Sequence, residues 1–233
     1  TFWNNGITGT TNITGLKDNE PVIAIVDTGI TLDHPDLKDN LWTNPYRDKL
    51  PGEHGYDFSN NDDDPYDDFG HGSHCAGIIA ASSNGTGIVG VNQNAKLMAL
   101  KVLNENGSAF DAEIIAAYCY IYKAQQLGVN VIAINNSWGG SYGSSEPKYE
   151  SVITTCIEMV GKQGALSVFA AGNDGSDVDA SPCPPASYSS DYILSVAASN
   201  ENDELASFSN YGAKNVDIAA PGANILSTVI SLN

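Results

Sequence analysis

The sequence predicts an α/β fold, doubly wound, with a largely parallel sheet flanked by helices. Two segments, residues 20–30 and 166–175, each carry an unbroken run of apolar residues that ends in polar or small residues. Such runs are typical of strands buried on both faces of a parallel sheet. Between them, residues 111–126 repeat apolar side chains at helical spacing. Strands that alternate with helices favour a parallel sheet whose faces are covered by helices.

The remaining elements show the same patterns along the chain. The helix at 111–126 begins at Asp111 and stops before Gly128, which are residue types suited to the two ends of a helix. A small apolar run at 76–81 predicts a buried helix, and an apolar stripe predicts another helix over 150–162. Further core strands are expected at residues 95–103, 129–134, 193–198 and 216–220.

Length and composition fit one globular domain. The 233 residues are 42% hydrophobic, and no apolar run reaches the length of a membrane-spanning helix. The formal net charge of −18 argues against nucleic acid or an anionic membrane as a partner. Residues 1–19 are polar and turn-rich, so we expect them to wrap the surface of a core formed by residues 20–233. The expected organisation is a single domain over residues 1–233.

Three segments present residue types suited to catalysis. Asp27 closes the first apolar strand, at the strand end where α/β proteins place their sites. His71 lies between two glycines before the apolar run at 76–81, at or near a helix N-terminus, where an imidazole can act as a general base. Asn173 is presented by the small-residue turn after a later strand. For His71 the alternative is a surface turn without chemistry, and His34 competes for the role from a loop before a proline.

These segments together resemble the subtilisin-like serine peptidases, the subtilases. Val-Asp-Thr-Gly at 26–29, His-Gly-Ser-His-Cys-Ala-Gly at 71–77 and Ala-Ala-Gly-Asn at 170–173 occur in the order that the family has. The similarity runs from about Pro21 to the end of the chain. It implies the three-layer subtilisin-like fold and the activity of a serine endopeptidase, which hydrolyses peptide bonds.

The resemblance gives each catalytic candidate a role. It implies that Asp27 orients and electrostatically supports His71, and that His71 is the general base. It implies that Asn173 donates a hydrogen bond to the oxyanion that forms during peptide hydrolysis.

The nucleophile of the family has no counterpart in this chain. In family members, Ala-Pro-Gly, present here at 220–222, leads through a loop to a Gly-Thr-Ser-Met segment that carries the catalytic serine. No Gly-Thr-Ser occurs between there and Asn233. We therefore expect the serine on a downstream segment, or on a second chain after a cleavage near Asn233, so that residues 1–233 are an incomplete peptidase domain. The alternatives are a catalytically inactive, peptide-binding protein with the subtilase fold, or a truncated fragment.

The resemblance also implies where a peptide or protein substrate binds. One segment after the strand at 95–103 matches the family's edge strand, which pairs with the substrate backbone. A segment after the strand at 129–134 matches the second substrate strand, and residues near Asn173 and in a later loop match the walls of the primary specificity pocket. The implied substrate-binding residues are Gly107, Ser108, Ala109, Ser137, Trp138, Gly139, Gly140, Ala170, Gly172, Pro185 and Ala186.

An acidic loop predicts a structural calcium site. Six aspartates fall between residues 55 and 69, where their charges repel one another unless a cation compensates them. Ca²⁺ takes oxygen ligands from flexible loops of this kind, while the alternative is a solvated acidic loop. The loop is similar to the calcium loop of thermitase-like subtilases. That similarity implies side-chain ligands from Asp57 and Asp62, carbonyl ligands from Asp64 and Tyr66, and Asn60 as a further candidate.

A second calcium loop is implied by the glycine-rich segment after the predicted histidine helix. It resembles the high-affinity calcium loop of the family, in which consecutive carbonyls turn toward one point. The implied ligands are the side chains of Asp36 and Asn84 and the carbonyls of Ser82, Thr86 and Ile88.

The cysteines and the resemblance together suggest the environment and the partners of the protein. Cys75 is expected as a buried thiol close to the catalytic residues, and one disulfide among Cys119, Cys156 and Cys183 is possible in a secreted protein. Because family relatives are mostly secreted, the resemblance implies an extracellular location and zymogen processing. It also implies a propeptide or inhibitor as a partner besides the substrate.

Overall fold

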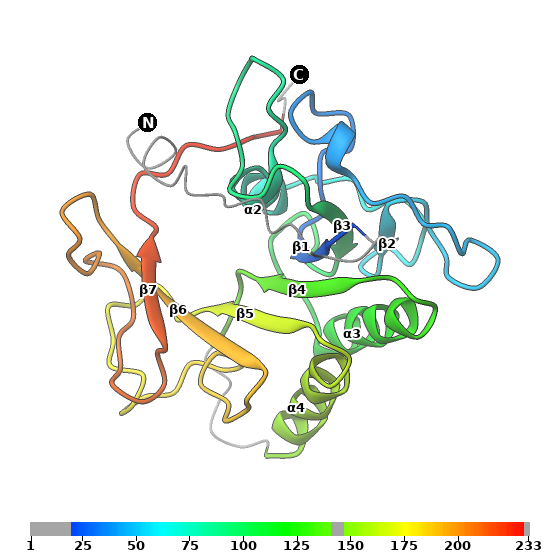
Figure 1. Cartoon of the computed structure of the whole chain (residues 1–233). Helices are drawn as coiled ribbons and strands as arrows, with labels where there is room; N and C mark the ends of the chain where they lie inside the picture. Colours follow the sequence, from blue (N-terminus) through cyan, green and yellow to red (C-terminus); the bar gives the residue numbers. More distant parts are fainter. Residues whose placement is uncertain (1–19, 141–146, 231–233) are drawn as a thin grey trace. The chain divides into compact units, whose positions relative to one another are not determined.

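The structure, a computed structural model, describes residues 20–140 and 147–230 (Figure 1). Contacts within the chain divide it into two compact units. Unit 1 comprises residues 1–133 and 226–233, and unit 2 comprises residues 134–225. The expected surface wrap of residues 1–19 lies outside the described residues, and the expected single domain over the whole chain stays a prediction.

Three parallel strands in the order β2-β3-β1 form the sheet of unit 1. β1 (Val22–Asp27) pairs with β3 (Lys96–Lys101), and β2 (Gly55–Asp57) pairs with the other edge of β3. The apolar residues of β1 and β3 are buried almost throughout, as expected for strands covered on both faces. The register places Asp27 opposite Lys101, so the carboxyl ends of these two strands meet at one edge of the sheet.

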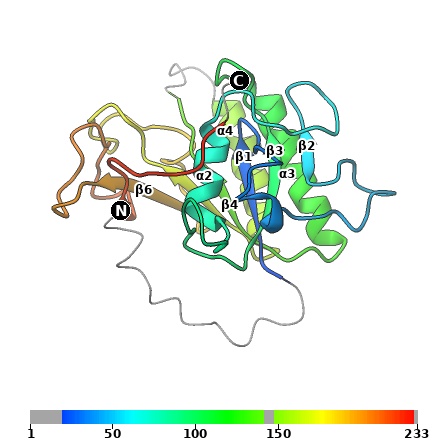
Figure 2. The same ribbon diagram turned by 90° about the horizontal axis from the view of Figure 1, so that it is seen from above.

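Two helices lie on opposite faces of these strands. α2 (His71–Ala80) covers one face of β1 and β3, and α3 (Asp111–Gln126) covers the other, as both Figure 1 and Figure 2 show. The buried residues of α2 are glycine, serine and alanine, which lets the helix approach the sheet closely. A short 3₁₀ helix, η1 (Lys38–Asn40), precedes β2. The apolar core of this region consists of Ile25, Ile30, Leu37, Leu41, Ala76, Ala80, Ala95, Leu97 and Ala99.

Unit 2 contains three further parallel strands in the order β5-β6-β7. These strands are β5 (Leu166–Ala170), β6 (Ile193–Ser199) and β7 (Ile218–Pro221). α4 (Pro147–Gly161) contacts β5 (Figure 1). β4 (Val131–Asn136) starts in unit 1 and ends in unit 2 along the chain.

The predicted α/β class, with parallel strands and flanking helices, is confirmed. The helix predicted at 111–126 is observed over the same residues. α2 begins at His71, which confirms the predicted place of this residue at a helix N-terminus. Its first turn precedes the apolar run at 76–81 because polar groups, rather than apolar burial, hold the helix start. β2 was not predicted, since three residues are too few for a periodic pattern.

One predicted strand differs from the structure. Residues 107–109 were expected as an edge strand, but they form an irregular segment that leaves a turn. Gly107 has a φ of +71°, and its amide donates to the carbonyl of Asn104 over 2.9 Å. The turn bends the chain where a strand needs an extended backbone.

Among the described residues, no helix has both the length and the apolar character needed to cross a membrane.

Candidate active site

Asp27 and His71 form a hydrogen-bonded pair in unit 1. Nδ1 of His71 donates to Oδ1 of Asp27 over 2.7 Å. The Asp27 side chain is fully buried, whereas 42% of the His71 side chain is exposed. Asp27 is the last residue of β1 and His71 is the first residue of α2, so two rigid elements hold the pair. A carboxylate that accepts from Nδ1 fixes the tautomer in which Nε2 is able to take up a proton.

The surroundings of Asp27 leave its charge largely uncompensated. The amide of Thr28 donates to the same Oδ1 over 2.7 Å, but Oδ2 has no hydrogen-bond partner among the described residues. Burial of a carboxylate with so few donors favours a positive charge on the neighbouring imidazole. Ligand atoms of Asp27, His71 and Cys75 lie within 4.8 Å of one another, so Cys75 is close to the pair as predicted, although it is half-buried rather than buried.

None of the four cysteines forms a disulfide, and all four lie in the described part of the chain. The disulfide considered possible among Cys119, Cys156 and Cys183 is therefore absent from this structure.

The pKa of His71 is raised above its ordinary value of 6.5. The hydrogen bond to Asp27 is the main cause, burial of the ring opposes it, and the negative charges of Asp27 and Asp67 add to the increase. A general base has to be neutral to accept a proton. Base catalysis by His71 therefore needs a pH above this raised pKa.

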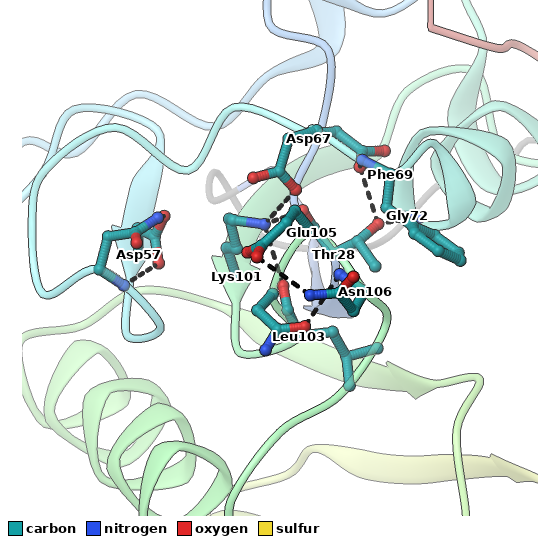
Figure 3. Close-up of polar contacts among 12 residues, drawn as sticks. Thr28, Asp57, Asp67, Phe69, Gly72, Lys101, Leu103, Glu105 and Asn106 are labelled. Atoms are coloured by element: carbon teal, nitrogen blue, oxygen red, sulfur yellow. Dashed lines mark hydrogen bonds and ion pairs between the residues drawn. The ribbon is translucent and has the colours of Figure 1, made fainter.

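A second buried carboxylate, Asp67, fixes the start of α2. Its side chain is only 1% exposed, and its two oxygens accept five hydrogen bonds. The donors are the hydroxyl of Thr28, the amides of Phe69 and Gly70, and the amide and hydroxyl of Ser73. Figure 3 shows Asp67 and Phe69 beside the helix that starts there. A carboxylate at this position satisfies amides that a helix N-terminus leaves without partners, and it matches the helix dipole.

Thr28 links the strand end directly to the helix start. Its hydroxyl donates to Asp67 and accepts from the amide of Gly72 over 2.9 Å, as Figure 3 shows. Gly72 has no room for a side chain, because a Cβ there would lie 2.1 Å from a backbone carbonyl oxygen after β1. Thr28 comes directly after Asp27, and Gly72 directly after His71, in the sequence. The two neighbours of the catalytic candidates are thus bonded to each other.

A buried lysine bonds the backbone just beyond the carboxyl ends of β1 and β3. Lys101 is 1% exposed, and its Nζ donates to the carbonyls of Thr28 and Leu103 and, over 2.6 Å, to the carboxylate of Asp68. Figure 3 shows the lysine side chain beside Thr28 and Leu103. Three acceptors, one of them charged, compensate the buried ammonium group. Because Asp68 lies three residues before His71, the lysine also ties the loop that enters α2 to the sheet.

Sequence reasoning missed the roles of Asp67, Asp68 and Lys101. The two aspartates belong to the acidic loop for which a cation was expected, but protein donors compensate both of them. A lysine at the end of an otherwise apolar strand was the available signal for Lys101, since a charge in a buried strand needs a partner. For Asp67 the signal was a capping residue type shortly before a helix start.

Asn173 lies in an exposed turn after β5, within unit 2. Its side chain has no hydrogen-bond partner in the described segments, so the amide is available as a donor. The turn borders a cavity of about 240 Å³. Trp138 lies outside the cavity lining, and its ring packs edge-on against Phe169 with centroids 5.7 Å apart. The cavity lining includes four of the predicted site residues, which are Ser137, Ala170, Gly172 and Asn173.

The glycines after β4 approach the loop that was predicted as the far wall of the specificity pocket. The amide of Gly140 donates to the carbonyl of Pro184 over 3.3 Å. A Cβ on Gly139 would lie 3.3 Å from the same oxygen, so a larger residue would press against this loop. Pro185 and Ala186 come next in the chain, and Ala186 is 5% exposed. Within unit 2 the structure therefore brings these two predicted substrate segments together.

The predicted substrate segment of unit 1 lies near the histidine loop. A Cβ on Gly107 would lie 3.3 Å from the ring of Phe69, which is two residues before His71. The amide of Asn104 donates to the carbonyl of Ser108 over 2.9 Å, so this carbonyl is already used within the turn. Ala109 is the next residue of the irregular segment before α3.

The glycine-rich candidate calcium loop gathers all of its predicted residues, which are Asp36, Ser82, Asn84, Thr86 and Ile88. The two carboxylate oxygens of Asp36 accept from the side-chain amide of Asn84 over 2.9 Å and from the amide of Ile88 over 3.1 Å. Gly87 has a φ of +60°, and a Cβ there would lie 2.0 Å from Oδ2 of Asp36. The loop thus surrounds the buried carboxylate of Asp36, and a side chain at position 87 would fill the space beside it. The carboxylate, amide and carbonyl oxygens of this loop are ligand types that Ca²⁺ prefers.

The predicted ligands of the acidic candidate calcium loop converge less. Asp57 and Asp62 face each other, each amide donating to the other's carbonyl over 3.0 Å. The buried carboxylate of Asp57 accepts from the amide and side chain of Asn60 over 2.8 and 2.9 Å, and Asp62 accepts from the amide of Asp64 over 2.9 Å. The predicted ligand atom of Tyr66 is its carbonyl oxygen, and its side-chain hydroxyl donates to Asp33 over 3.0 Å. No trio of carboxylates converges in this loop, as far as the described residues go.

Comparisons with known proteins agree with this arrangement. The model of the Subtilase family matches residues 18–233. The chain is 39% identical over 207 residues to thermitase of Thermoactinomyces vulgaris, covering 88% of this chain and 64% of that protein. It is 38% identical over 208 residues to the thermophilic serine proteinase of Bacillus sp. (strain AK1), covering 89% and 45%.

A solved structure agrees at the level of the fold. A crystal structure of a cold adapted subtilisin-like serine proteinase matches with a TM-score of 0.70 at 27% identity, covering 91% of this chain and 66% of that one. The chain thus spans about half to two thirds of the length of these relatives. On the family match and the shared fold, the chain belongs to the Subtilase family of serine peptidases, and its relatives include thermitase.

Proposed function

We propose that this chain carries the general base and the oxyanion donor of a subtilisin-like serine endopeptidase. The observation that carries the proposal is the 2.7 Å hydrogen bond from Nδ1 of His71 to the fully buried Asp27. A surface histidine without chemistry has no need of a buried carboxylate, which is costly to desolvate. The family membership supplies the reaction class.

In the proposed reaction a serine from polypeptide beyond this chain is the nucleophile. Nε2 of His71 takes the serine proton as the serine oxygen attacks the peptide carbonyl, and Asp27 stabilises the imidazolium that forms. The side-chain amide of Asn173 and the backbone amide of the serine donate to the oxyanion. His71 then gives its proton to the leaving amine, which departs as the acyl-enzyme forms. Water repeats the sequence and releases the second product.

Substrate recognition is proposed to use two short segments, one in each unit. A peptide backbone would pair with Gly107–Ala109 and with Ser137–Gly140, which bear small side chains except for Trp138. Ala170, Gly172, Pro185 and Ala186 would border the side chain before the scissile bond. The cavity beside Asn173 supports this assignment for Ala170 and Gly172, which line it, whereas Pro185 and Ala186 do not.

Calcium is proposed as a structural ion without a chemical role. Asp36, Asn84 and the carbonyls of Ser82, Thr86 and Ile88 would hold it in the glycine-rich loop, and bound Ca²⁺ would fix that loop to the turn after β1. Asp57, Asp62, Asp64 and Tyr66 remain candidates for a second ion. Secretion, zymogen processing and a propeptide or inhibitor partner belong to the same proposal.

The test uses the complete polypeptide as it occurs in its source. We expect a fluorophosphonate probe to label it at a serine, and we expect His71→Ala to abolish both labelling and peptide hydrolysis. The matched control is His54→Ala, which changes a histidine of the same unit whose ring bonds the carbonyl of Trp42 instead of a carboxylate. Mass spectrometry under denaturing conditions then shows whether the labelled serine is on the same polypeptide as His71 or on a second one.

Two outcomes contradict the proposal. Peptide binding without labelling or turnover would make the protein an inactive subtilase-fold binding protein. Labelling and turnover that survive His71→Ala would remove this histidine as the base.

A further inference from the structure

Asn210 is a buried residue of unit 2 that bonds the backbone on both sides of Asn173. Its side chain is 1% exposed. Nδ2 donates to the carbonyl of Ala171 over 3.0 Å, and Oδ1 accepts from the amides of Asp174 and Ser176 over 2.9 and 3.0 Å. One amide side chain thus reaches three backbone groups of the turn that presents Asn173.

The backbone of Asn210 adds a fourth bond to the same turn. Its amide donates to the carbonyl of Gly172 over 2.9 Å. Gly172 has a φ of +111°, and a Cβ there would lie 2.2 Å from Nδ2 of Asn210. The glycine and the asparagine therefore fit each other, since any side chain at 172 would displace the amide group.

Asn173 itself depends on this support. Its own side chain has no hydrogen-bond partner within the described chain, and the residue is exposed. Its direction is set by the backbone, because no hydrogen bond of its own holds it. The bonds from Asn210 to the carbonyls of Ala171 and Gly172 and to the amides of Asp174 and Ser176 fix that backbone.

Asn210 is in turn held on the sheet of unit 2. The hydroxyl of the preceding Ser209 donates to the carbonyl of Asn210 over 3.0 Å and accepts from the amide of Ala198 in β6 over 2.8 Å. Ser209 is 2% exposed. The chain of bonds runs from β6 through Ser209 and Asn210 to the Asn173 turn, so a strand supports the turn.

We propose that Asn210 is a positioning residue that aims the side-chain amide of Asn173 at the oxyanion, a role that rests on the proposed peptidase function. An oxyanion donor contributes only when it is held where the charge develops. Misplacement of such a group by about 1 Å can cost as much as ~10²-fold in rate. Removal of Asn210 would therefore lower the rate of the chemical step and leave substrate binding nearly unchanged.

The experiment is a double-mutant cycle on the complete enzyme, with kcat and KM measured on one peptide substrate. We expect Asn210→Ala to lower kcat about 10- to 100-fold and to change KM by less than about 2-fold. If Asn210 acts through Asn173, Asn210→Ala should cause no further loss of kcat in a variant that already carries Asn173→Ala. The double variant should then turn over within about 2-fold of Asn173→Ala alone.

The matched control is Asn200→Ala. The Asn200 side chain also accepts from two backbone amides, those of Asn202 and Glu204, but neither of these bonds reaches the Asn173 turn. We expect its kcat to stay within about 2-fold of the parent enzyme. If Asn210→Ala does not fold, as judged by circular dichroism, Asn210→Ser replaces it in the cycle, because its hydroxyl keeps a polar group at the site.

The outcomes separate the two proposals. Three outcomes would overturn the role of Asn210 and leave the proposed peptidase function unaffected. They are an equal loss of kcat from Asn210→Ala with and without Asn173, a rise in KM at constant kcat, and an unchanged kcat. The proposed function and the role of Asn210 would both be overturned if the parent enzyme does not hydrolyse peptides, or if Asn173→Ala leaves its kcat unchanged.

Discussion

The Asp27–His71 pair of unit 1 and the Asn173 turn of unit 2 are supported by different chemistry. Around His71 the supporting groups are charged, namely the buried carboxylates of Asp27 and Asp67 and the ion pair of Lys101 with Asp68. Around Asn173 the support is one neutral amide, Asn210, and backbone groups.

The difference predicts that the role of the unit 1 pair depends on pH and that the role of the unit 2 turn does not. Hydrogen bonds to ionised groups are stronger than neutral ones, and they shift the pKa of the groups they touch. His71 must change its charge during the proposed reaction, and the carboxylates around it favour the charged form. Asn173 only donates a hydrogen bond, so a neutral support is sufficient. Substitutions in unit 1 are therefore expected to move the pH profile, whereas substitutions around Asn173 should change only the rate.

The largest effect is expected from Asp27→Asn in the complete enzyme. We expect kcat to fall about 10⁴-fold, which is the known scale of this loss in serine peptidases, subtilisin included. Because the hydrogen bond to Asp27 is the main cause of the raised His71 pKa, the pKa should fall and the acidic limb of kcat/KM should move to lower pH. Stopped-time assays across pH with a sensitive peptide substrate measure both changes. An acidic limb that stays in place would break the assignment of His71 as the titrating base.

A smaller loss is expected from Asn173→Ala. Removal of the corresponding oxyanion donor in subtilisin itself is known to cost about 10²–10³ in kcat, and we expect the same scale here with little change in KM. The acidic limb should stay where it is in the parent enzyme, because Asn173 carries no charge. Steady-state kinetics at several pH values tests both parts. A shifted limb would mean that the two supports are not chemically separate.

Calcium should stabilise unit 1 selectively, since both candidate loops belong to that unit. A ligand at 100 times its Kd adds about 2.7 kcal/mol to the free energy of unfolding. Thermal unfolding with calcium and after chelation measures the gain, and amide hydrogen exchange assigns it to residues. We expect Asp36→Asn to remove the part of the gain that comes from its own loop, and the exposed Asp39→Asn to retain the whole gain. Equal protection of unit 2 amides would argue against a local role.

The smallest of these effects is expected from Asp67→Asn. The amide replaces one carboxylate oxygen by a donor that faces other donors, which should cost roughly 1–3 kcal/mol of stability. The pKa of His71 should fall slightly, because the charge of Asp67 is one of the causes of its increase. Urea unfolding measures the stability, and the exposed Asp63→Asn is the control. Stability equal to that of the control would mean that the five hydrogen bonds contribute no net free energy.

Features that depend on local sequence pattern were the most predictable. The helix at 111–126 was found because its apolar spacing and end residues agree, and Asp27 and His71 were found because each stands beside a recognisable element. Supports that depend on contacts between distant segments were not found. Nothing in the sequence around Asn210 indicates that it reaches back to the turn at Asn173.

Acidic residues were the least predictable part of the site. Asp67 and Asp68 belong to the same run of aspartates as Asp62, and charge alone does not distinguish them. In the folded chain Asp67 meets the amides of a helix start and Asp68 meets Lys101, whereas Asp62 stays exposed. Only the fold decides which carboxylate receives a protein partner and which stays exposed.

The central claim is that a buried carboxylate holds His71 ready to act as a base. NMR titration of its imidazole tests this on the chain itself, without any need for turnover, and His71→Ala assigns its signal among the four histidines. We predict a pKa above the ordinary 6.5 that falls in Asp27→Asn. Because the folded pKa is the raised one, the pair should stabilise the fold fully below pH 6.5 and lose this contribution as the pH rises through the folded value. A pKa at or below 6.5 in the parent chain, unchanged in Asp27→Asn, would contradict the account.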